Sequence, residues 1–321
     1  MFRGILITPE YEKFGELIPE EMIFEETRTD KASYIITPTF FNAHTHLGDA
    51  ALRETPRKPL EEIVGPGGYK HRMLEGTDVE KLREHAVLEV EASRKAGTSH
   101  FLDFREGGVR GLDVTRGLDG VLTLARPSSV EEAESIGAFG FAYSSTRDHD
   151  AKLVEEVREV ARRKKMVFGI HAGERDCEDV DSAIALDPDF VVHMNMCPER
   201  IQSLIDAEIP IVSCLRSNAF FGLLNTRSYE ILQDYDGWML GTDNAMTSTS
   251  SILDEMHFAA YILENDKSIF RAAVRGYELF GVESGYIIFN RRYSFKRTSN
   301  FISTLVRRAG IYDIETVLIK K

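Results

Sequence analysis

Residues 37–47 read TPTFFNAHTHL and combine a strand-like run with two histidines spaced two apart. The run Thr37–Ala43 is short, rich in aromatic and β-branched residues and bounded by polar ones, which is typical of a buried strand in a parallel sheet. Residues i and i+2 of a strand point to the same side, so His44 and His46 can face one point and share a metal ion. The segment therefore predicts a strand with part of a metal site at its carboxyl end.

Seven further runs along the chain have the same character. They are Ser99–Phe104, Val121–Ala125, Phe139–Ser144, Met166–Ile170, Phe190–His193, Ile209–Cys214 and Trp238–Gly241. Segments with helical spacing of apolar residues lie between most of them. Eight strands alternating with helices are the pattern of a (β/α)8 barrel of the TIM type, an α/β fold, which we expect over residues 37–285. Periodicity alone does not close a sheet, so a doubly wound open sheet is the alternative.

The two ends of the chain differ from this central part. Short β-like segments occur there: Ile5–Thr8, Tyr34–Ile36, Tyr286–Phe289, Phe301–Val306 and Thr316–Ile319. We expect residues 1–36 and 286–321 to pair into a small flanking β subdomain outside the barrel.

Composition excludes several classes of protein. The 321 residues include 43% hydrophobic and 28% charged residues, close to an ordinary globular protein, and carry a net charge of −13. This excess of negative charge argues against nucleic acid or an anionic membrane as the partner. No run approaches the ~18–20 apolar residues that cross a bilayer, and the first residues lack the apolar core of a signal peptide. We therefore expect a cytoplasmic protein that acts on a small molecule, and a homo-oligomer is compatible with the sequence.

The three cysteines form no recognisable framework. Cys177, Cys197 and Cys214 are odd in number and lack C-x-x-C spacing. The pattern therefore predicts neither a disulfide framework nor a zinc knuckle, and Cys214 is interpreted as a small buried residue.

Further metal-ligating side chains stand where other predicted strands end. The fifth strand is followed by His171 and Glu174, the sixth ends at His193, and the eighth is followed by Asp243. Active sites of such barrels lie at the carboxyl ends of the strands, so these side chains are expected to converge with the histidines of the first strand. Imidazoles with one carboxylate suit zinc or another divalent first-row metal.

Five motifs in this order resemble the amidohydrolase superfamily of metal-dependent hydrolases, in its aminohydrolase (deaminase and chlorohydrolase-like) branch. They are Asn42–Leu47, His171-x-x-Glu174, the lone His193, Cys214–Asn218 and Leu240–Asn244. The usual segment that leads from the last barrel helix into a flanking β-sandwich is not recognisable in residues 284–296, so the appendage is expected to be reduced or rearranged.

The resemblance implies a role for each site residue. His44, His46, His171 and Asp243 would bind the metal. Glu174 would carry a proton from the attacking water to a ring nitrogen. His193 would orient the nucleophile, and Asp243 would pass a second proton to departing ammonia. A bound metal can lower the pKa of its water towards ~7, which agrees with these roles.

The third and fourth strands end without the lysine or acidic residue that bridges two metals in binuclear members of this superfamily. Their ends read Leu124-Ala125-Arg126 and Ala142-Tyr143-Ser144-Ser145. We therefore expect one divalent metal per chain, Zn²⁺ first, with Fe²⁺ or Mn²⁺ as alternatives.

The predicted function is deamination of an amino-substituted nitrogen heterocycle, such as a purine, pyrimidine or pterin. One alternative is a hydrolase that uses the same metal site on a cyclic amide or a carbon–halogen bond. Another is a non-catalytic barrel that only binds, against which Glu174 argues, because a silent relative has no need of a proton shuttle.

Arginines recur just after the predicted strands and suggest an anionic substrate. With Asn218, the candidates for substrate contact are Arg105, Arg147 and Arg216. Guanidinium groups bind carboxylate or phosphate through two hydrogen bonds. The alternative is that these arginines pair with neighbouring acidic residues, since Glu106 follows Arg105 and Asp148 follows Arg147.

Overall fold

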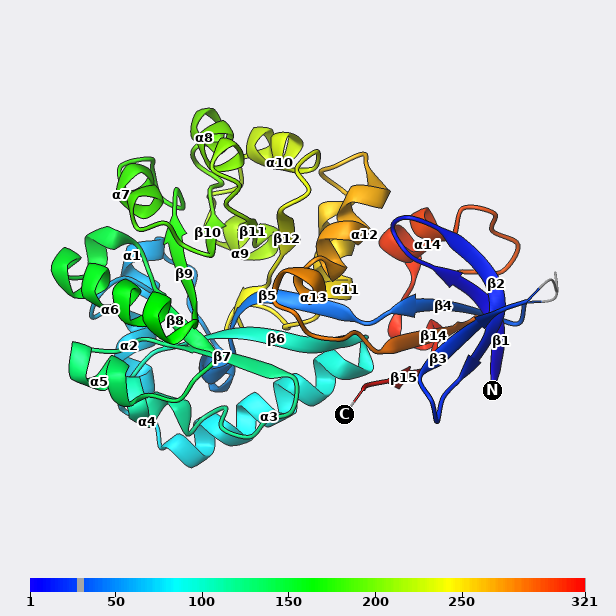
Figure 1. Cartoon of the computed structure of the whole chain (residues 1–321), viewed down its shortest axis with the longest axis horizontal. Helices are drawn as coiled ribbons and strands as arrows, with labels where there is room; N and C mark the ends of the chain where they lie inside the picture. The colour runs from blue at the N-terminus through cyan, green and yellow to red at the C-terminus, as the bar shows by residue number, and fades with distance from the viewer. Residues whose placement is uncertain (28–31, 321) are drawn as a thin grey trace.

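The computed structural model describes residues 1–27 and 32–320. These residues fold around two β-sheets (Figure 1). The larger sheet has nine strands, and every neighbouring pair runs parallel. In chain order they are β5 (Phe40–His46), β6 (Thr98–Arg105), β7 (Val121–Ala125), β8 (Gly140–Tyr143), β9 (Val167–Ala172), β10 (Phe190–His193), β11 (Ile211–Ser213), β12 (Trp238–Leu240) and β13 (Asp243–Asn244). The predicted α/β class with a parallel sheet is confirmed.

The sheet curls so that its two ends meet. β12 pairs with β11, and two residues later β13 pairs with β5, where Asp243 lies opposite Thr45. Asn42 reinforces this junction: its Nδ2 donates to Thr242 Oγ1 (2.7 Å), and its Oδ1 accepts from the backbone amides of His44 and Thr242 (both 3.2 Å). The residues that follow β12 therefore lie directly beside β5, the first strand of this sheet.

Helices surround the outside of this curled sheet (Figure 1). They are α1 (Leu60–Ile63), α2 (Tyr69–Glu75), α3 (Val79–Lys95), α4 (Gly108–Leu112), α5 (Val130–Ser135), α6 (Ala151–Lys164), α7 (Val180–Ala185), α8 (Ile201–Asp206), α9 (Leu215–Phe220), α10 (Thr226–Leu232), α11 (Ile252–Ala259), α12 (Asp266–Val274) and α13 (Gly276–Leu279), with 3₁₀ turns η1 (Leu47–Ala51), η2 (Thr146–Asp148), η3 (Pro198–Arg200) and η4 (Ile311–Asp313). None of the helices in the described ranges is both long and apolar enough to cross a membrane.

Helix α6 shows why these segments are helical. The Asp150 side chain caps its start by accepting hydrogen bonds from the Lys152 and Leu153 amides, and Val154 and Val157 are buried on one face. The interior of the sheet is filled with apolar side chains from successive strands. Among them are Phe41, Ala43, Leu102, Phe104, Leu124, Ala142, Phe190, Val192, Val212 and Met239. This packed interior leaves the carboxyl edge as the place where polar side chains gather.

The smaller sheet joins the two ends of the chain, to one side of the larger sheet (Figure 1). Its strands lie in the order β15 (Ile314–Leu318), β14 (Tyr286–Asn290), β4 (Tyr34–Pro38), β1 (Phe2–Ile7), β2 (Glu12–Ile18) and β3 (Ile23–Glu26). β4 and β14 run antiparallel and connect the N-terminal strands to the C-terminal ones.

Two expected strands differ from the structure. The single run Thr37–Ala43 is divided between the sheets, because β4 ends at Pro38, which has no amide hydrogen to donate, and β5 begins at Phe40. The segment Phe301–Val306 is not a β segment but the start of helix α14 (Phe301–Arg308). There Asn300 Oδ1 accepts from the Ser303 amide, and the burial of Phe301 and Leu305 follows helical spacing, so the β interpretation was wrong.

Candidate metal centre

Five side chains converge at the carboxyl edge of the curled sheet. β5 supplies His44 and His46, β9 supplies His171, β10 supplies His193, and β13 begins with Asp243; all five are buried. The ring centroids of His44 and His46 are 4.9 Å apart, those of His44 and His171 4.8 Å, and those of His171 and His193 4.7 Å. Asp243 Oδ1 lies 3.3 Å from His44 Nε2 and 3.5 Å from His46 Nε2.

These donor atoms fit a divalent metal. Within the described residues, the Nε2 atoms of His44, His171 and His193 and Oδ1 of Asp243 are buried without a hydrogen-bond partner. A buried polar atom without a partner costs free energy, so a cluster of them indicates a missing ligand. One donor atom from each of His44, His46 and His171 lies within 4.8 Å of the others, and the same holds for His44, His193 and Asp243. Imidazole nitrogens with a carboxylate are the ligand set that zinc and similar ions prefer.

The protonation states suit this role. Burial lowers the pKa of His44 to about 3 and holds that of His171 well below its usual value. Burial alone would raise the pKa of Asp243, but the neighbouring histidines, His44 first, outweigh it and keep that pKa well below its usual value. Neutral imidazoles beside an ionised carboxylate are the forms that bind a cation.

The backbone is strained at two of these residues, His193 and Asp243, and at the neighbouring Met194. His193 (φ 85°), Met194 (φ 56°) and Asp243 (φ 57°) adopt left-handed conformations that residues other than glycine avoid. Each costs about 1–3 kcal/mol and persists only when the surrounding structure imposes it. Strain of this kind collects at functional sites, as it does here around the convergent side chains.

Glu174 adjoins the cluster, because one donor atom from each of His171, Glu174 and His193 also lies within 4.8 Å of the others. Gly173 (φ 63°) turns the chain after β9, and Glu174 Oε1 then lies 3.5 Å from His193 Nε2. The Asn195 side chain donates to the Glu174 backbone carbonyl (3.2 Å) and fixes this turn. Burial raises the pKa of Glu174 to about 7, although the nearby His193 opposes the rise. A carboxyl group with such a pKa can both take and return a proton near neutrality.

A serine that sequence reasoning missed orients Asp243. Ser217 Oγ, at the start of α9, donates to Asp243 Oδ2 (2.5 Å) and leaves Oδ1 directed at the histidines. Its neighbours, predicted as substrate contacts, are engaged elsewhere: Arg216 Nε donates to Glu255 (2.6 Å), and Asn218 donates to the Tyr229 hydroxyl (2.8 Å). The signal for Ser217 was its place inside the Cys214–Asn218 motif.

A cavity of about 310 Å³ opens onto the cluster. Its lining includes His46, His171, Glu174 and Asp243, together with residues of α1 and α2. The four predicted substrate contacts are not among the described residues that line it, whereas three other arginines are. These three are Arg72, Arg126 and Arg175.

Acidic partners explain why the predicted arginines lie elsewhere. Arg105 is buried between Asp103 (3.8 Å) and Glu106 (2.5 Å). Arg147 contacts Asp176 (2.9 Å) and Glu178 (2.5 Å) near the surface. The alternative that these arginines pair with acidic residues therefore applies to both. Arg105 pairs with Glu106, as expected, whereas Arg147 pairs with Asp176 and Glu178 and not with its neighbour Asp148.

Behind the histidines lies a charged cluster that sequence reasoning also missed. Lys70, on α2, extends inward so that its Nζ lies 2.9 Å from Glu106 Oε1, 3.1 Å from Asp49 Oδ2 and 3.0 Å from Asn244 Oδ1. The same Glu106 oxygen is 2.9 Å from His46 Nδ1. A carboxylate behind a metal-ligating histidine holds its ring in orientation and increases its basicity. Glu106 follows β6 directly, and this position is the only feature of the sequence that indicates a role at the site.

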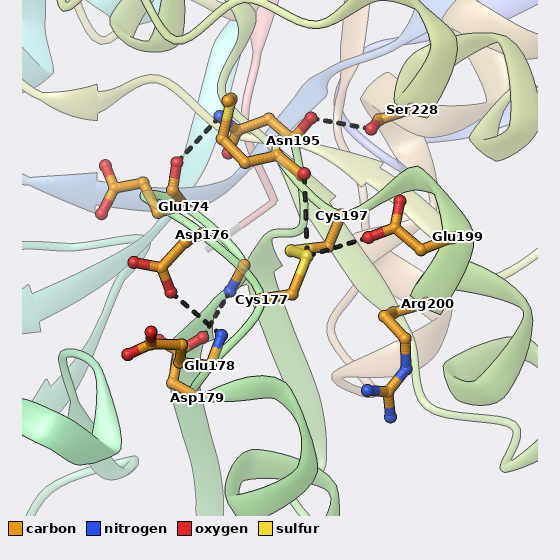
Figure 2. Close-up of a disulfide and its surroundings, with 12 residues drawn as sticks. Glu174, Asp176, Cys177, Glu178, Asp179, Asn195, Cys197, Glu199, Arg200 and Ser228 are labelled. Atoms are coloured by element: carbon orange, nitrogen blue, oxygen red, sulfur yellow. Dashed lines mark hydrogen bonds between the residues drawn. A yellow bond between two sulfur atoms is a disulfide. The ribbon is translucent and has the colours of Figure 1, made fainter.

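A disulfide between Cys177 and Cys197 corrects the expectation from the cysteine pattern (Figure 2). Its Cα atoms are 5.5 Å apart, and it connects the segment after β9 with the segment after β10. Because β9 and β10 are neighbours in the sheet, the two cysteines meet although 20 residues separate them, and no local spacing signals it. Cys214 is a buried free thiol, as interpreted.

Comparison with known proteins gives a relative over almost the whole chain and solved structures that share its fold. No protein-family model matches the chain. A protein of Archaeoglobus fulgidus named "Putative aminohydrolase" is 66% identical over 319 residues, which is 99% of this chain and 97% of that protein.

Two solved structures share the fold at low identity. A guanine deaminase from C. acetobutylicum with bound guanine has a TM-score of 0.77 at 13% identity and covers 99% of this chain and 98% of its own. An atrazine chlorohydrolase from Arthrobacter aurescens in complex with zinc has a TM-score of 0.75 at 15% identity, over 99% of this chain and 93% of its own. At these identities the similarity concerns the fold.

Proposed function

This chain belongs to the aminohydrolases of the amidohydrolase superfamily, hydrolases of carbon–nitrogen bonds, and we propose that it deaminates an amino-substituted nitrogen heterocycle. The observation that carries the proposal is the position of Glu174 beside His193, in the cavity that the metal-ligating cluster lines. A purine, pyrimidine or pterin presents an amino-bearing ring carbon next to a ring nitrogen, and Glu174 is placed to protonate such a nitrogen.

We assign the metal to His44, His46, His171 and Asp243, whose convergent atoms support one ion per chain. When bound, a divalent ion supplies Lewis acidity that lowers the pKa of water towards ~7. Zn²⁺ is the first candidate because the chlorohydrolase with this fold holds zinc, and Fe²⁺ or Mn²⁺ are alternatives.

The chain's own residues handle the protons. Glu174 takes a proton from the attacking water, whose oxygen bonds to the amino-bearing ring carbon, and gives that proton to the ring nitrogen, so that the carbon becomes tetrahedral. His193, 3.5 Å from Glu174, orients the attacking oxygen. Asp243, which Ser217 holds in place, accepts the second proton and passes it to the amino group, which departs as ammonia when the carbonyl forms.

The architecture supports a division into two parts. We propose that residues 37–285 form a (β/α)8 barrel, because β13 brings the end of the curled sheet back to β5. Residues 1–36 and 286–321 would then form the small flanking β subdomain, which the pairing of β4 with β14 supports.

A second candidate is a hydrolase that acts on a carbon–halogen bond or a cyclic amide with the same metal site. The fold shared with the chlorohydrolase supports it. A barrel that binds without catalysis is less well supported, because Glu174 is retained beside the donor cluster.

Ammonia release by the zinc-loaded protein tests the proposal. The panel holds amino-purines, amino-pyrimidines and amino-pterins, with cyclic amides and halogenated triazines assayed for their own products. We expect ammonia from at least one amino-heterocycle. Products formed only from amides or halides would support the second candidate function. No product from any compound would favour a barrel that binds without catalysis.

The matched variant is Glu174→Gln, which keeps the size of the side chain and removes the proton shuttle. We expect turnover to fall about 10²–10⁴-fold, the usual contribution of a positioned acid–base group, while the zinc content per chain stays unchanged. Full turnover in this variant would remove Glu174 from the mechanism.

A further inference from the structure

Arg126 lies immediately after β7 and lines the cavity of the metal-ligating cluster. Its side chain is 16% exposed, so the guanidinium is largely withdrawn from water but open towards the cavity. A partly buried cation of this kind normally has a carboxylate or carbonyl partner, because desolvation without compensation is costly.

Within the described part of the chain, the Arg126 guanidinium makes no hydrogen bond, and its Nε is buried without a partner. Glu106 Oε1 is the nearest carboxylate oxygen among the ion pairs, 3.9 Å from Nη2, which is beyond hydrogen-bond distance. That oxygen already lies 2.9 Å from both Lys70 Nζ and His46 Nδ1. Arg126 therefore keeps its hydrogen-bonding capacity.

The other cations of the lining are engaged. Arg175 donates to Asp148 (3.2 Å), Arg72 donates to the Gly67 carbonyl (2.5 Å), and Lys70 contacts two carboxylates. His149, on the same wall, is neutral at pH 7, because burial, assisted by Arg126, lowers its pKa to about 4. Among the arginines and lysines of the described lining, Arg126 is the one whose side chain makes no hydrogen bond.

We propose that Arg126 binds an anionic group, a carboxylate or phosphate, carried by the heterocyclic substrate. The inference rests on the proposed function and adds the class of substrate. A guanidinium offers paired donors to such a group, and partial burial strengthens the interaction. Because one Glu106 oxygen contacts His46 and approaches Arg126, the anion site adjoins the metal-ligating cluster. A single small molecule can thus reach both.

The wall beside Arg126 adds neutral donors. Ser144 Oγ lies 2.8 Å from His149 Nε2, and both residues line the cavity. A hydroxyl and a neutral imidazole can accept or donate hydrogen bonds without adding charge. The position therefore suits an anion that Arg126 neutralises and Ser144 orients.

The experiment compares binding of matched pairs that differ only in the anion: pterin with pterin-6-carboxylate, and adenosine with adenosine 5′-monophosphate. Dissociation constants are measured by calorimetry on zinc-loaded Glu174→Gln protein, so that turnover does not interfere. The variants on this background are Arg126→Met and Arg126→Lys. The control is Arg163→Met, a surface arginine that is 61% exposed and pairs with Glu134.

We expect the charged member of one pair to bind more tightly than the neutral member, and the pair that shows this distinguishes carboxylate from phosphate. Arg126→Met should weaken the charged member by about 10–100-fold, the range for a lost hydrogen bond to a charged group, and leave the neutral member within twofold. Arg126→Lys should retain part of the preference, and Arg163→Met should retain all of it.

Equal binding of charged and neutral members by the unsubstituted site would overturn the proposal, as would a preference that survives Arg126→Met. Failure of the proposed function looks different. If the preference depends on Arg126 but active protein releases no ammonia from any compound, deamination is wrong and the anion site stands.

Discussion

Two buried polar clusters lie side by side at the carboxyl edge of the curled sheet, and they differ in how their atoms are partnered. The metal-ligating cluster (His44, His46, His171, His193 and Asp243) contains several buried donor atoms without hydrogen-bond partners in the described chain. The charged cluster (Lys70, Asp49, Glu106, Arg105 and Asp103) also has buried atoms without a hydrogen-bond partner among the described residues, on Asp49, Asp103 and Arg105. Each of its charges, however, has an opposite charge within 4 Å.

The difference shows how the partners of buried polar groups indicate their function. Both clusters bear the cost of desolvation, and the charged cluster offsets it with ion pairs within the chain. We propose that the metal-ligating cluster offsets it with a bound cation. The two meet at Glu106, which contacts His46 on one side and Lys70 on the other. We therefore expect changes in the first cluster to affect metal and activity, and changes in the second to affect stability.

The largest expected effect on function comes from Asp243→Ala, which removes both a ligand and a proton acceptor. We expect zinc content to fall towards zero after dialysis and turnover to fall by about 10²–10⁴-fold or more. Metal analysis and ammonia release measure the two effects. The control is Asp236→Ala, an exposed carboxylate paired with Arg271. Full zinc content in Asp243→Ala would contradict the ligand assignment.

The charged cluster gives the largest expected effect on stability. Lys70→Met keeps the length of the side chain but leaves Asp49 and Glu106 without their shared cation. Breaking a buried pair from one side costs about 3–5 kcal/mol, and we expect the free energy of unfolding to fall by that amount in denaturant titrations. Lys58→Met, which breaks an exposed pair with Glu62, should change it by under about 1 kcal/mol. Equal effects of the two variants would show that burial of Lys70 carries no special cost.

The two clusters also differ in whether their residues could be predicted from the sequence. The proposed metal ligands could be identified because each stands at or just after the end of an apolar run, and the ends of parallel strands share one edge. His44 and His46 also have the spacing that places both on one side of a strand. The parallel α/β sheet was predictable for the same reason, since the runs and helical segments alternate.

The charged cluster had no such signal. Lys70 lies on α2, and its partners Asp49 and Glu106 come from η1 and from the segment after β6, so only the packing of α2 in the fold brings them together. The disulfide between Cys177 and Cys197 depends on the adjacency of β9 and β10 in the same way. Arginines after strands were visible in the sequence, but which of them lacks an acidic partner depends on the fold.

The link between the two clusters can be tested with Glu106→Gln. The amide keeps the shape but loses the charge that supports His46, and loss of such a supporting carboxylate weakens metal affinity by about 10–100-fold. Competition for zinc with a chromogenic chelator measures this change. Glu178→Gln, on an exposed carboxylate paired with Arg147, is the control. Unchanged affinity in Glu106→Gln would mean that the 2.9 Å contact with His46 does not tune the ligand.

The smallest expected effect concerns His149, a partly buried side chain outside both clusters. Burial, with a contribution from Arg126, lowers its pKa from 6.5 to about 4, so the folded protein keeps the ring neutral while the unfolded chain protonates it. Its contribution to stability is therefore complete above pH 6.5 and is lost progressively as the pH falls towards 4. We expect the free energy of unfolding of metal-free protein to fall more steeply over this window than that of His149→Asn, with the curves parallel above pH 7. Parallel curves throughout would show that the pKa of the ring is the same in the folded and the unfolded protein, so that burial does not lower it.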